Sequence, residues 1–275
     1  MIFVANGADA SANNLGKVSI KTIEDVSQET YDVITEYGNK SFTNDQIIAI
    51  DDFLVQLKNL STYSRFTYFI LPILSPATEQ GEMGTDTLWT DTNPCYDIIS
   101  KQRYSSDGFN GYIDKHGLRC YKNSSNTARV LAKNGIQVNC INLTVGVCMI
   151  NNNPDFFAGV SRNQATFGAS DKQVKIAFKT EITNNITPIV TTFSRTNSEA
   201  HGVRNGEIGT VSAFSDEHYL GQTYTLKKLL ESTFSDSVND GNVVSFMFLC
   251  SGYGMNEQEL IDINNICLNL MKALW

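Results

Sequence analysis

The sequence predicts a mainly-β fold, a jelly-roll β-sandwich with an N-terminal helical segment and a C-terminal helix. Three observations lead to this prediction. Short β-branched and aromatic segments recur from residue 66 onward, and turn residues separate them. Charged residues make up only 18% of the chain, and Asn, Ser and Thr, which favour turns, supply much of the remaining polar surface. Strands do not alternate with helices along the chain, so a doubly wound α/β sheet is not expected.

The length of the chain suggests a division into three parts. Its 275 residues suffice for one sandwich of about 200 residues and a small N-terminal element. We expect an extended anchoring arm over 1–21, a helical assembly segment over 22–65, and the sandwich with its closing helix over 66–275. Phe3 and Val4 form an apolar start that the arm cannot bury by itself, so we expect them to dock onto a partner.

Two helices are expected in the helical segment. Over 22–37, the apolar residues share one helical face, and Gly38 is suited to end the helix. A second helix over 44–58 begins with a T-x-x-Q capping box formed by Thr43 and Gln46. The pair either packs on the neighbouring sandwich or forms an oligomerisation element, and the sequence leaves both readings open.

The strands that we expect are short. The segment FTYFILPI over 66–73 is aromatic and β-branched, and Pro72 places it at a sheet edge or at a strand end. Over 173–181, apolar and polar residues alternate with a period of two, which is typical of a strand with one buried face. A polar loop is expected from Ser75 to Pro94. Further strands are expected over 95–100, 109–114, 118–121, 140–150, 187–194 and 243–250.

Two short sequence motifs towards the end of the chain predict local structure. Asn205-Gly206 predicts a hairpin, because this pair suits the positive φ angles of a type I′ turn. Asn256 and Glu259 form an N-x-x-E helix start, and apolar residues then follow helical spacing to Leu274. This helix either closes the sandwich or forms a short two-heptad coiled coil.

Charge and hydropathy exclude several classes of protein. The formal net charge is −8, and no cluster of Lys and Arg is visible in the sequence, so a nucleic-acid binder is not expected. No segment approaches the ~18 consecutive apolar residues of a membrane span. The apolar run from Met1 to Ala5 is too short for a secretion signal.

The six cysteines include no C-x-x-C pair. We interpret them as reduced, buried, small hydrophobic residues. Disulfides in an oxidising compartment and ligation of a metal remain as alternatives.

No catalytic constellation is visible in the sequence. His116, His201 and His218 lie in polar, turn-like stretches, and only His116 and Cys120 have a metal-like spacing, without a third ligand nearby. In SGYGMN, Met255 stands where a phosphate loop requires Lys. A glycosidase needs paired carboxylates, and no strand carries them at alternate positions. We therefore expect no enzymatic activity, no cofactor and no metal.

Sugar binding without catalysis requires less, because exposed aromatic rings can stack on sugar faces. Asp86 and Asp91 flank the ring of Trp89 and make a calcium site conceivable, although they lack the spacing of an EF-hand. Each aromatic candidate has ordinary packing in its own domain as the alternative. The candidate glycan-binding residues are Trp89, in the polar loop DTLWTDTN, and Tyr104, Tyr112 and Tyr253.

Five segments carry a resemblance to a known family. They are FTNDQIIAIDDFLVQLKNL with YSRFTYFILPIL, then DGFNGYID, FSRTNSEAHGVRNGEIGT and FMFLCSGYGMNEQEL, and finally the helix through Leu274. In this order, over about residues 42–275, they resemble the concanavalin-A-like (laminin-G-like) virion structural proteins of tailed phages, including phages of gut Bacteroidetes. Tyr63 departs from the family pattern, which has Trp at this place.

The resemblance implies a concanavalin-A-like jelly roll and a virion role as a head fibre, a capsid decoration or a tail accessory protein. Such a protein is exposed on the particle and is assembled in the host cytoplasm. The expected partners are other capsid or tail proteins, further copies of the chain in a homo-oligomer, and a host surface glycan. A carbohydrate-binding module of a bacterial surface system and a glycoside hydrolase remain as alternatives. The resembling residues are turns, caps and strand cores, so they assign no catalytic or ligand site.

Overall fold

The fold was analysed in a computed structural model. The structure describes residues 21–78, 96–108, 111–120, 127–139, 141–149, 158–160, 164–167, 174–179, 188–214, 223–233 and 243–275.

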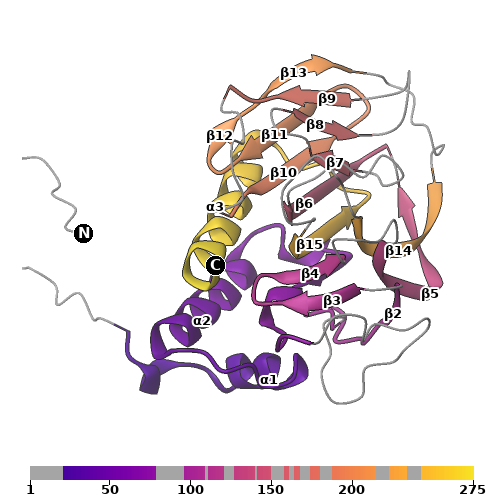
Figure 1. Cartoon of the computed structure of the whole chain (residues 1–275). Helices are drawn as coiled ribbons and strands as arrows, with labels where there is room; N and C mark the ends of the chain where they lie inside the picture. Colours follow the sequence, from indigo (N-terminus) through magenta and orange to yellow (C-terminus); the bar gives the residue numbers. More distant parts are fainter. Residues whose placement is uncertain are drawn as a thin grey trace, which may run out of the picture.

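The described chain forms three layers (Figure 1). The first layer contains α1 (Gln28–Glu36), α2 (Asn44–Asn59) and α3 (Glu257–Leu274). The second layer, here called the central sheet, contains β1 (Tyr68–Ile70), β3 (Gly111–Asp114), β4 (Gly117–Cys120), β6 (Leu143–Met149), β10 (Val190–Arg195), β11 (Ala200–Arg204), β12 (Glu207–Ile208) and β15 (Val243–Ser251). Its strand order is β12-β11-β10-β6-β15-β4-β3, and β1 also pairs with β15.

Two smaller sheets form the third layer. One has the order β13-β9-β8-β7, and the other has the order β14-β5-β2. Their strands are β2 (Ser105–Gly108), β5 (Thr127–Asn139), β7 (Ala158–Val160), β8 (Gln164–Phe167), β9 (Val174–Ala177), β13 (Thr210–Ala213) and β14 (Thr223–Thr233). The architecture is the mainly-β sandwich with an N-terminal helical segment and a closing C-terminal helix that the sequence predicts.

Strand β15 is buried on both faces, which explains its continuous apolar sequence. Phe246 and Phe248 point into the core shared with the helices. Met247 and Leu249 point into the core shared with the smaller sheets. A strand between two layers needs apolar residues at every position, rather than the alternation of a half-exposed strand. β15 therefore forms the centre of the molecule.

The N-terminal helices share a core with the sheet and with α3. Val33 of α1 and Phe53 of α2 belong to the same buried cluster as Phe248 and Leu260. The Phe53 and Phe69 rings lie edge to face with their centroids 5.5 Å apart, and the centroids of Phe69 and Phe248 are 5.0 Å apart. Aromatic pairs at these distances stabilise beyond the area that they bury. Of the two readings of the helix pair that the sequence leaves open, packing on the sandwich is thus observed.

The local signals for helices and for the hairpin are confirmed. α2 begins with the predicted capping box, because Thr43 Oγ1 accepts from Gln46 N at 3.3 Å. α3 begins in the same way at Asn256 and Glu259. Asn205, between β11 and β12, has a φ of 49°, and the following glycine also has a positive φ, as the type I′ turn requires.

The chain crosses between two layers at Gly209. This residue follows β12 of the central sheet and precedes β13 of a smaller sheet. A Cβ here would lie 2.4 Å from Cγ2 of Ile176, so only glycine fits the corner. The corner lets one continuous segment join the edges of two sheets.

Three expectations need correction. The strand expected over 95–100 does not form in its described part, 96–100, because Tyr96 and Asp97 form only isolated bridges and a turn follows. The buried Asp97 carboxylate holds this turn by accepting from Ile99 N at 3.0 Å and from Ser100 Oγ. The helix expected over 22–37 is broken into a 3₁₀ turn (Ile23–Asp25) and α1.

The break in that helix has a tertiary cause. The backbone is extended at Val26 and Ser27, where Ser27 N and Oγ donate to the buried Asp51 of α2 at 2.9 and 2.6 Å.

The third correction concerns 66–73, where the strand covers only Tyr68–Ile70. Pro72 begins a 3₁₀ turn (Pro72–Leu74), which agrees with its predicted place at a strand end.

Candidate functional site

The candidate site is built on the hairpin of β3 and β4. Ile113 and Leu118 face inward from this hairpin and are fully buried in the sandwich core. Tyr112 and Asp114 of β3 are partly exposed on the opposite face, as is Arg119 of β4. Tyr112 and Arg119 are register partners, so their side chains share one face of the hairpin.

Gly117 fixes the hairpin against the central strand. Its φ is +131°, and a Cβ would lie 2.4 Å from the carbonyl oxygen of Val244 on β15. Glycine is therefore required both by the backbone conformation and by the close approach of two backbones. This contact positions the loop residues Lys115 and His116.

Asp114 organises the outer face of the hairpin. One of its oxygens accepts from the backbone N of His116 at 2.7 Å, and the other accepts from Nε of Arg119 at 2.6 Å. The Tyr112 hydroxyl makes no hydrogen bond within the described part of the chain. Asp114 thus orients the loop and the arginine, and the tyrosine hydroxyl is available for an incoming ligand.

Lys40 reaches the same place from the segment between α1 and α2. Its Nζ donates to the carbonyl oxygens of Ile73 at 2.8 Å and of Lys115 at 3.0 Å. Burial lowers the pKa of Lys40, and the carboxylate of Asp114 partly offsets this effect. The ammonium group is therefore held beside the hairpin loop rather than free in solvent.

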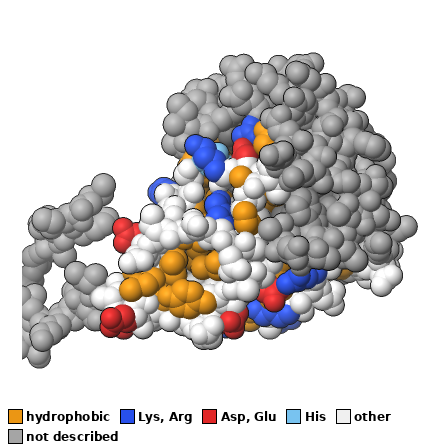
Figure 2. Space-filling model, turned by 60° about the horizontal axis from the view of Figure 1, so that its bottom comes forward, with side chains coloured by type: hydrophobic (Ala, Val, Ile, Leu, Met, Phe, Trp, Pro, Cys, Tyr) orange, Lys and Arg blue, Asp and Glu red, His pale blue; other side chains and the backbone are white. Residues whose placement is uncertain are grey.

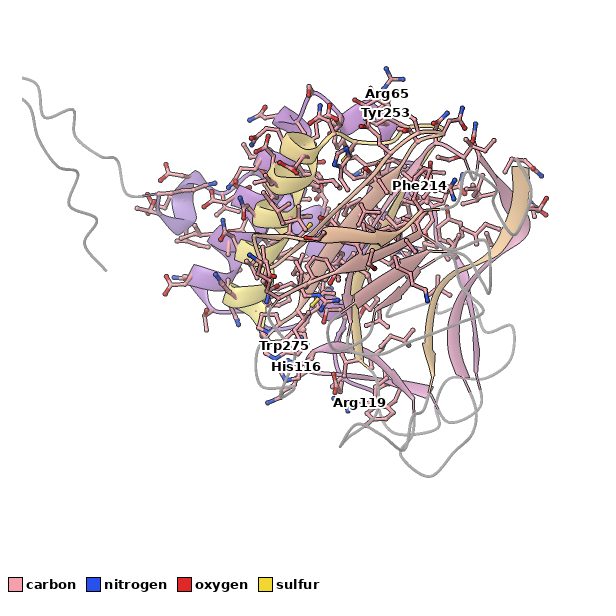
Figure 3. The ribbon with its side chains drawn as sticks, turned by 90° about the horizontal axis from the view of Figure 1, so that it is seen from above. Arg65, His116, Arg119, Phe214, Tyr253 and Trp275 are labelled. Atoms are coloured by element: carbon pink, nitrogen blue, oxygen red, sulfur yellow. The ribbon has the colours of Figure 1, made fainter. Side chains whose placement is uncertain are left out.

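His116 and Trp275 form an aromatic pair at this edge. Their ring centroids are 4.4 Å apart with an interplanar angle of 23°, so the rings are stacked. Figure 3 shows both rings close to Arg119. The Nδ1 atom of His116 is buried and has no hydrogen-bond partner in the described structure. The pair joins the β3–β4 loop to the end of α3.

Burial and both signs of charge act on the His116 ring. Burial lowers the pKa of His116, and the neighbouring Lys115, Arg119 and Lys40 lower it further, against an opposing effect of Asp114. Arg119 is ion-paired with Asp114, whereas no described carboxylate bonds to Lys40 or Lys115. We name this set, with Tyr112 and Trp275, the hairpin site: Lys40, Tyr112, Asp114, Lys115, His116, Arg119 and Trp275.

The other predicted glycan residues lie elsewhere. Tyr104 is near the Asp97 turn, where its hydroxyl approaches Asp97 Oδ2 at 3.4 Å. Tyr253, between β15 and α3, donates to Glu259 Oε1 at 2.8 Å, and the Arg65 guanidinium lies 5.0 Å from its ring centroid. Figure 3 shows Arg65 and Tyr253 at the opposite edge from the hairpin site.

No hydrogen bond or ring contact among the described residues joins Tyr104, Tyr112 and Tyr253 to one another. The structure therefore places these three predicted residues on separate elements. Trp89, the conceivable calcium ligands in its loop, and the anchoring residues Phe3 and Val4 lie outside the described residues.

Sequence reasoning missed the basic cluster at the hairpin site. Lys40 is 75 positions from Lys115 in the chain, so only the fold brings them together. The run Lys115, His116, Arg119 within DKHGLR was a visible local signal, but three residues did not qualify as a cluster. His116 lies in the β3–β4 turn, as expected, and its ring is stacked on Trp275, whereas His201 lies within β11 rather than in a turn. His218 lies outside the described residues.

Three cysteines behave as predicted. Cys148, Cys250 and Cys267 are free and buried, and burial raises the pKa of the Cys148 thiol to about 12. The other cysteine side chains lie outside the described structure. Within the described ranges, no group of three or more His, Cys, Asp or Glu side chains is placed to hold a metal ion. None of the described helices is long and apolar enough to cross a membrane.

Comparison with known proteins gives only partial structural similarities. No protein-family model and no curated protein matches the sequence. A mutant sialidase of Trypanosoma rangeli has a TM-score of 0.44 at 7% identity, covering 82% of this chain and 39% of its own. The chain spans about a third of the length of other T. rangeli sialidase structures.

Two further structures are similar over part of the chain. Domain 4 of a Geobacillus stearothermophilus arabinanase, solved with arabinotriose, has a TM-score of 0.34 at 10% identity, covering 62% of this chain and 92% of its own. The binding domain of botulinum neurotoxin serotype G has a TM-score of 0.28 at 14% identity, covering 62% and 48%.

Proposed function

We propose that the chain is a non-enzymatic structural protein on the surface of a tailed-phage particle, and that its sandwich contacts a host glycan through the hairpin site. It would act as a head fibre, a capsid decoration or a tail accessory protein. Repeated copies on a particle would convert weak glycan contacts into avidity.

The hairpin site is the observation that carries this proposal. Tyr112 presents a hydroxyl without a hydrogen-bond partner among the described residues, and Trp275 provides an indole ring at the same edge. Arg119 and Asp114 supply charged donors and acceptors that a rigid hairpin holds in place. Aromatic rings beside fixed hydrogen-bonding groups are the combination that recognises the apolar faces and hydroxyls of sugars.

The placement of the five resembling segments supports the virion role. They contain α2, β1, β3, the β10–β12 strands, β15 and α3, which belong to the central sheet or to the helices that cover it, and they also include the end of β2 and the first residue of β13 in the smaller sheets. Segments that are distant in the sequence therefore build one structural unit. The resemblance concerns that unit, and not scattered surface motifs.

The helical side of the molecule offers a route for attachment. The Lys21 ammonium group donates to Asp51 and Asp52 of α2, which ties the end of the arm to the helices. Tyr31 and Val55 are among the exposed large hydrophobic side chains, and Figure 2 shows hydrophobic side chains gathered on this side. We propose that the arm with Phe3 and Val4 binds a capsid or tail protein there, and that the chain forms a homo-oligomer.

A glycan array tests the proposed contact. The intact chain should bind a subset of glycans without releasing a hydrolysis product. Tyr112→Ala should lower that binding, whereas Tyr31→Ala, which removes an exposed tyrosine from α1, should not. Equal binding by both variants would remove the hairpin site from the proposal.

Particle association requires a separate test. An antibody against the purified chain should label the surface of intact phage particles whose genome encodes the chain, and mass spectrometry of those particles should detect its peptides. A chain that lacks residues 1–21 should no longer be incorporated. Unchanged incorporation would contradict the anchoring role of the arm, and absence from all particles would contradict the virion role.

A further inference from the structure

We infer that the hairpin site takes an acidic glycan, whose carboxylate or sulfate group is bound by the cations around His116. This inference rests on the proposed glycan contact and specifies the chemistry of the sugar. It follows from the charge balance, the geometry of the lysines, and the unpartnered imidazole nitrogen.

The charge balance is unusual for this protein. The whole chain carries a formal charge of −8, yet among the described groups that act on His116 the Asp114 carboxylate is paired with Arg119, which leaves the cations Lys40 and Lys115. At physiological salt, charges are screened beyond about 8 Å, so a ligand at this edge is governed by the local cations. An oxyanion is attracted here although the protein as a whole is acidic.

The lysines are placed to bind such a group. Lys115 is exposed, and its ammonium makes no hydrogen bond or ion pair with another described residue, so it can turn towards a ligand. Two hydrogens of the Lys40 ammonium are directed to the carbonyl oxygens of Ile73 and Lys115, which leaves one donor. A partly buried lysine with two neutral acceptors gains from a nearby anion, because no carboxylate bonds to it directly.

The aromatic pair supplies the sugar-binding part of the site. Trp275 stacks on His116 and is partly exposed. The buried Nδ1 of His116 has no partner, and a buried polar atom in that condition is stabilised when a hydroxyl or a water molecule reaches it. A sugar ring at this edge can satisfy this nitrogen with a hydroxyl while its acidic group meets the lysines.

Matched pairs of probes test the inference on the full chain by titration calorimetry. Tetragalacturonate is compared with its fully methyl-esterified form, which keeps the rings and removes the charges. Dextran sulfate is compared with dextran, so that sulfate and carboxylate are tested separately. We expect the charged member of at least one pair to bind at least about tenfold more tightly, with an affinity that falls as salt is raised.

Charge variants locate the site. Lys115→Glu should weaken binding of the charged probe by about tenfold, and Lys115→Ala by about threefold, as expected for one ion pair in partial contact with solvent. Lys179→Glu, which changes the same charge on an exposed lysine after β9, should leave the affinity within about twofold. Trp275→Ala should weaken binding in both salt conditions, because it removes an apolar contact.

The outcomes separate the inference from the proposed function. If charged and neutral probes bind with equal affinity, and Lys115→Glu does not change that affinity, the acidic specificity is overturned. The proposed glycan contact is not contradicted by this result. Equal losses of affinity for the charged probe in Lys115→Glu and Lys179→Glu would show that the probe responds to the overall charge of the protein. This result would overturn the hairpin site as the binding site. If neither charged probe binds, the inference fails. The proposed glycan contact fails as well only if the chain also binds none of the neutral and acidic glycans on the array.

Discussion

The buried side chain of Asn264 accepts a hydrogen bond at 2.9 Å from the backbone N of Gly206, in the turn between β11 and β12. The amide nitrogen of the same side chain donates to the carbonyl oxygens of Val190 and Val203, each at 3.1 Å. One asparagine of α3 therefore joins the helix to two strands and to the turn of the predicted hairpin. It gives the Gly206 N–H an acceptor and adds a donor to the carbonyl oxygens of the two strands.

Replacing Asn264 with Ala should lower the free energy of unfolding by about 2–4 kcal/mol, because several buried donors and acceptors lose their partner. Asn265→Ala is the control, since the neighbouring side chain is exposed and its removal should change stability by less than about 0.5 kcal/mol. Urea unfolding followed by circular dichroism measures both. Similar stability of the two variants would contradict a role for Asn264 in fixing the turn.

Gly117→Ala should destabilise the protein by more than about 2 kcal/mol. The added Cβ meets the carbonyl oxygen of Val244 at 2.4 Å, and the φ of +131° is unfavourable for alanine. Gly252→Ala isolates the cost of the backbone conformation, because its φ is also positive but no atom lies within 4 Å of the added carbon. We expect a loss of only about 1 kcal/mol there. Thermal unfolding of both variants checks the difference.

Acid should destabilise the protein through Asp51. Burial raises the pKa of Asp51, but hydrogen bonds from Lys21, Ser27 and Thr30 outweigh it and hold the pKa well below the usual 3.8. A carboxylate with a lowered folded pKa stabilises the fold above the unfolded value, and this stability is lost as pH falls through 3.8 towards the folded pKa.

The measurement is the urea midpoint between about pH 6 and pH 3, with Asp51→Asn beside the unchanged chain. The variant should be less stable at neutral pH and should have a flatter dependence on pH. Asp52→Asn is the control, because Asp52 is more exposed and shares only the Lys21 contact. An unchanged slope in Asp51→Asn would show that other carboxylates set the acid response.

Those parts of the fold whose signals are local in sequence could be predicted. The capping pair Thr43 and Gln46 identifies the start of α2, and Asn205 with Gly206 identifies the hairpin, because each interaction spans only a few residues. The break before α1 could not be predicted in this way. It depends on hydrogen bonds from Ser27 to Asp51, which lies 24 positions further along the chain.

The long strands β5 and β14 were missed for a similar reason. They pair from Thr127 with Thr233 to Asn139 with Thr223, and their register shifts twice near Lys228. The segment LKKLLEST has residues that favour a helix, so long-range pairing overrides its propensity. The hairpin site shares this origin, because Lys40 and Trp275 reach the β3–β4 loop only through the packing of α2 and α3 on the central sheet.

The His116 imidazole should titrate below its usual 6.5, because burial lowers its pKa and the nearby cations lower it further, against the opposing effect of Asp114. NMR titration of the ring protons, assigned with a His116→Gln variant, measures this pKa. Lys115→Glu should raise it by replacing a repelling charge with an attracting one. Lys179→Glu should leave it unchanged.

The lowered pKa also sets the sign of a stability change. Between the folded pKa and 6.5 the unfolded chain binds more protons at this position than the folded chain, so stability is present at neutral pH and declines as pH falls through this window. The melting temperature should therefore fall less between about pH 7 and pH 5.5 in His116→Gln than in the unchanged chain.

A bound oxyanion would oppose this decline by stabilising the imidazolium. Adding the charged probe should thus raise the pKa of His116 in the unchanged chain, and the rise should be smaller in Lys115→Glu, which binds the probe less tightly. An equal rise in both would place the anion away from the hairpin loop.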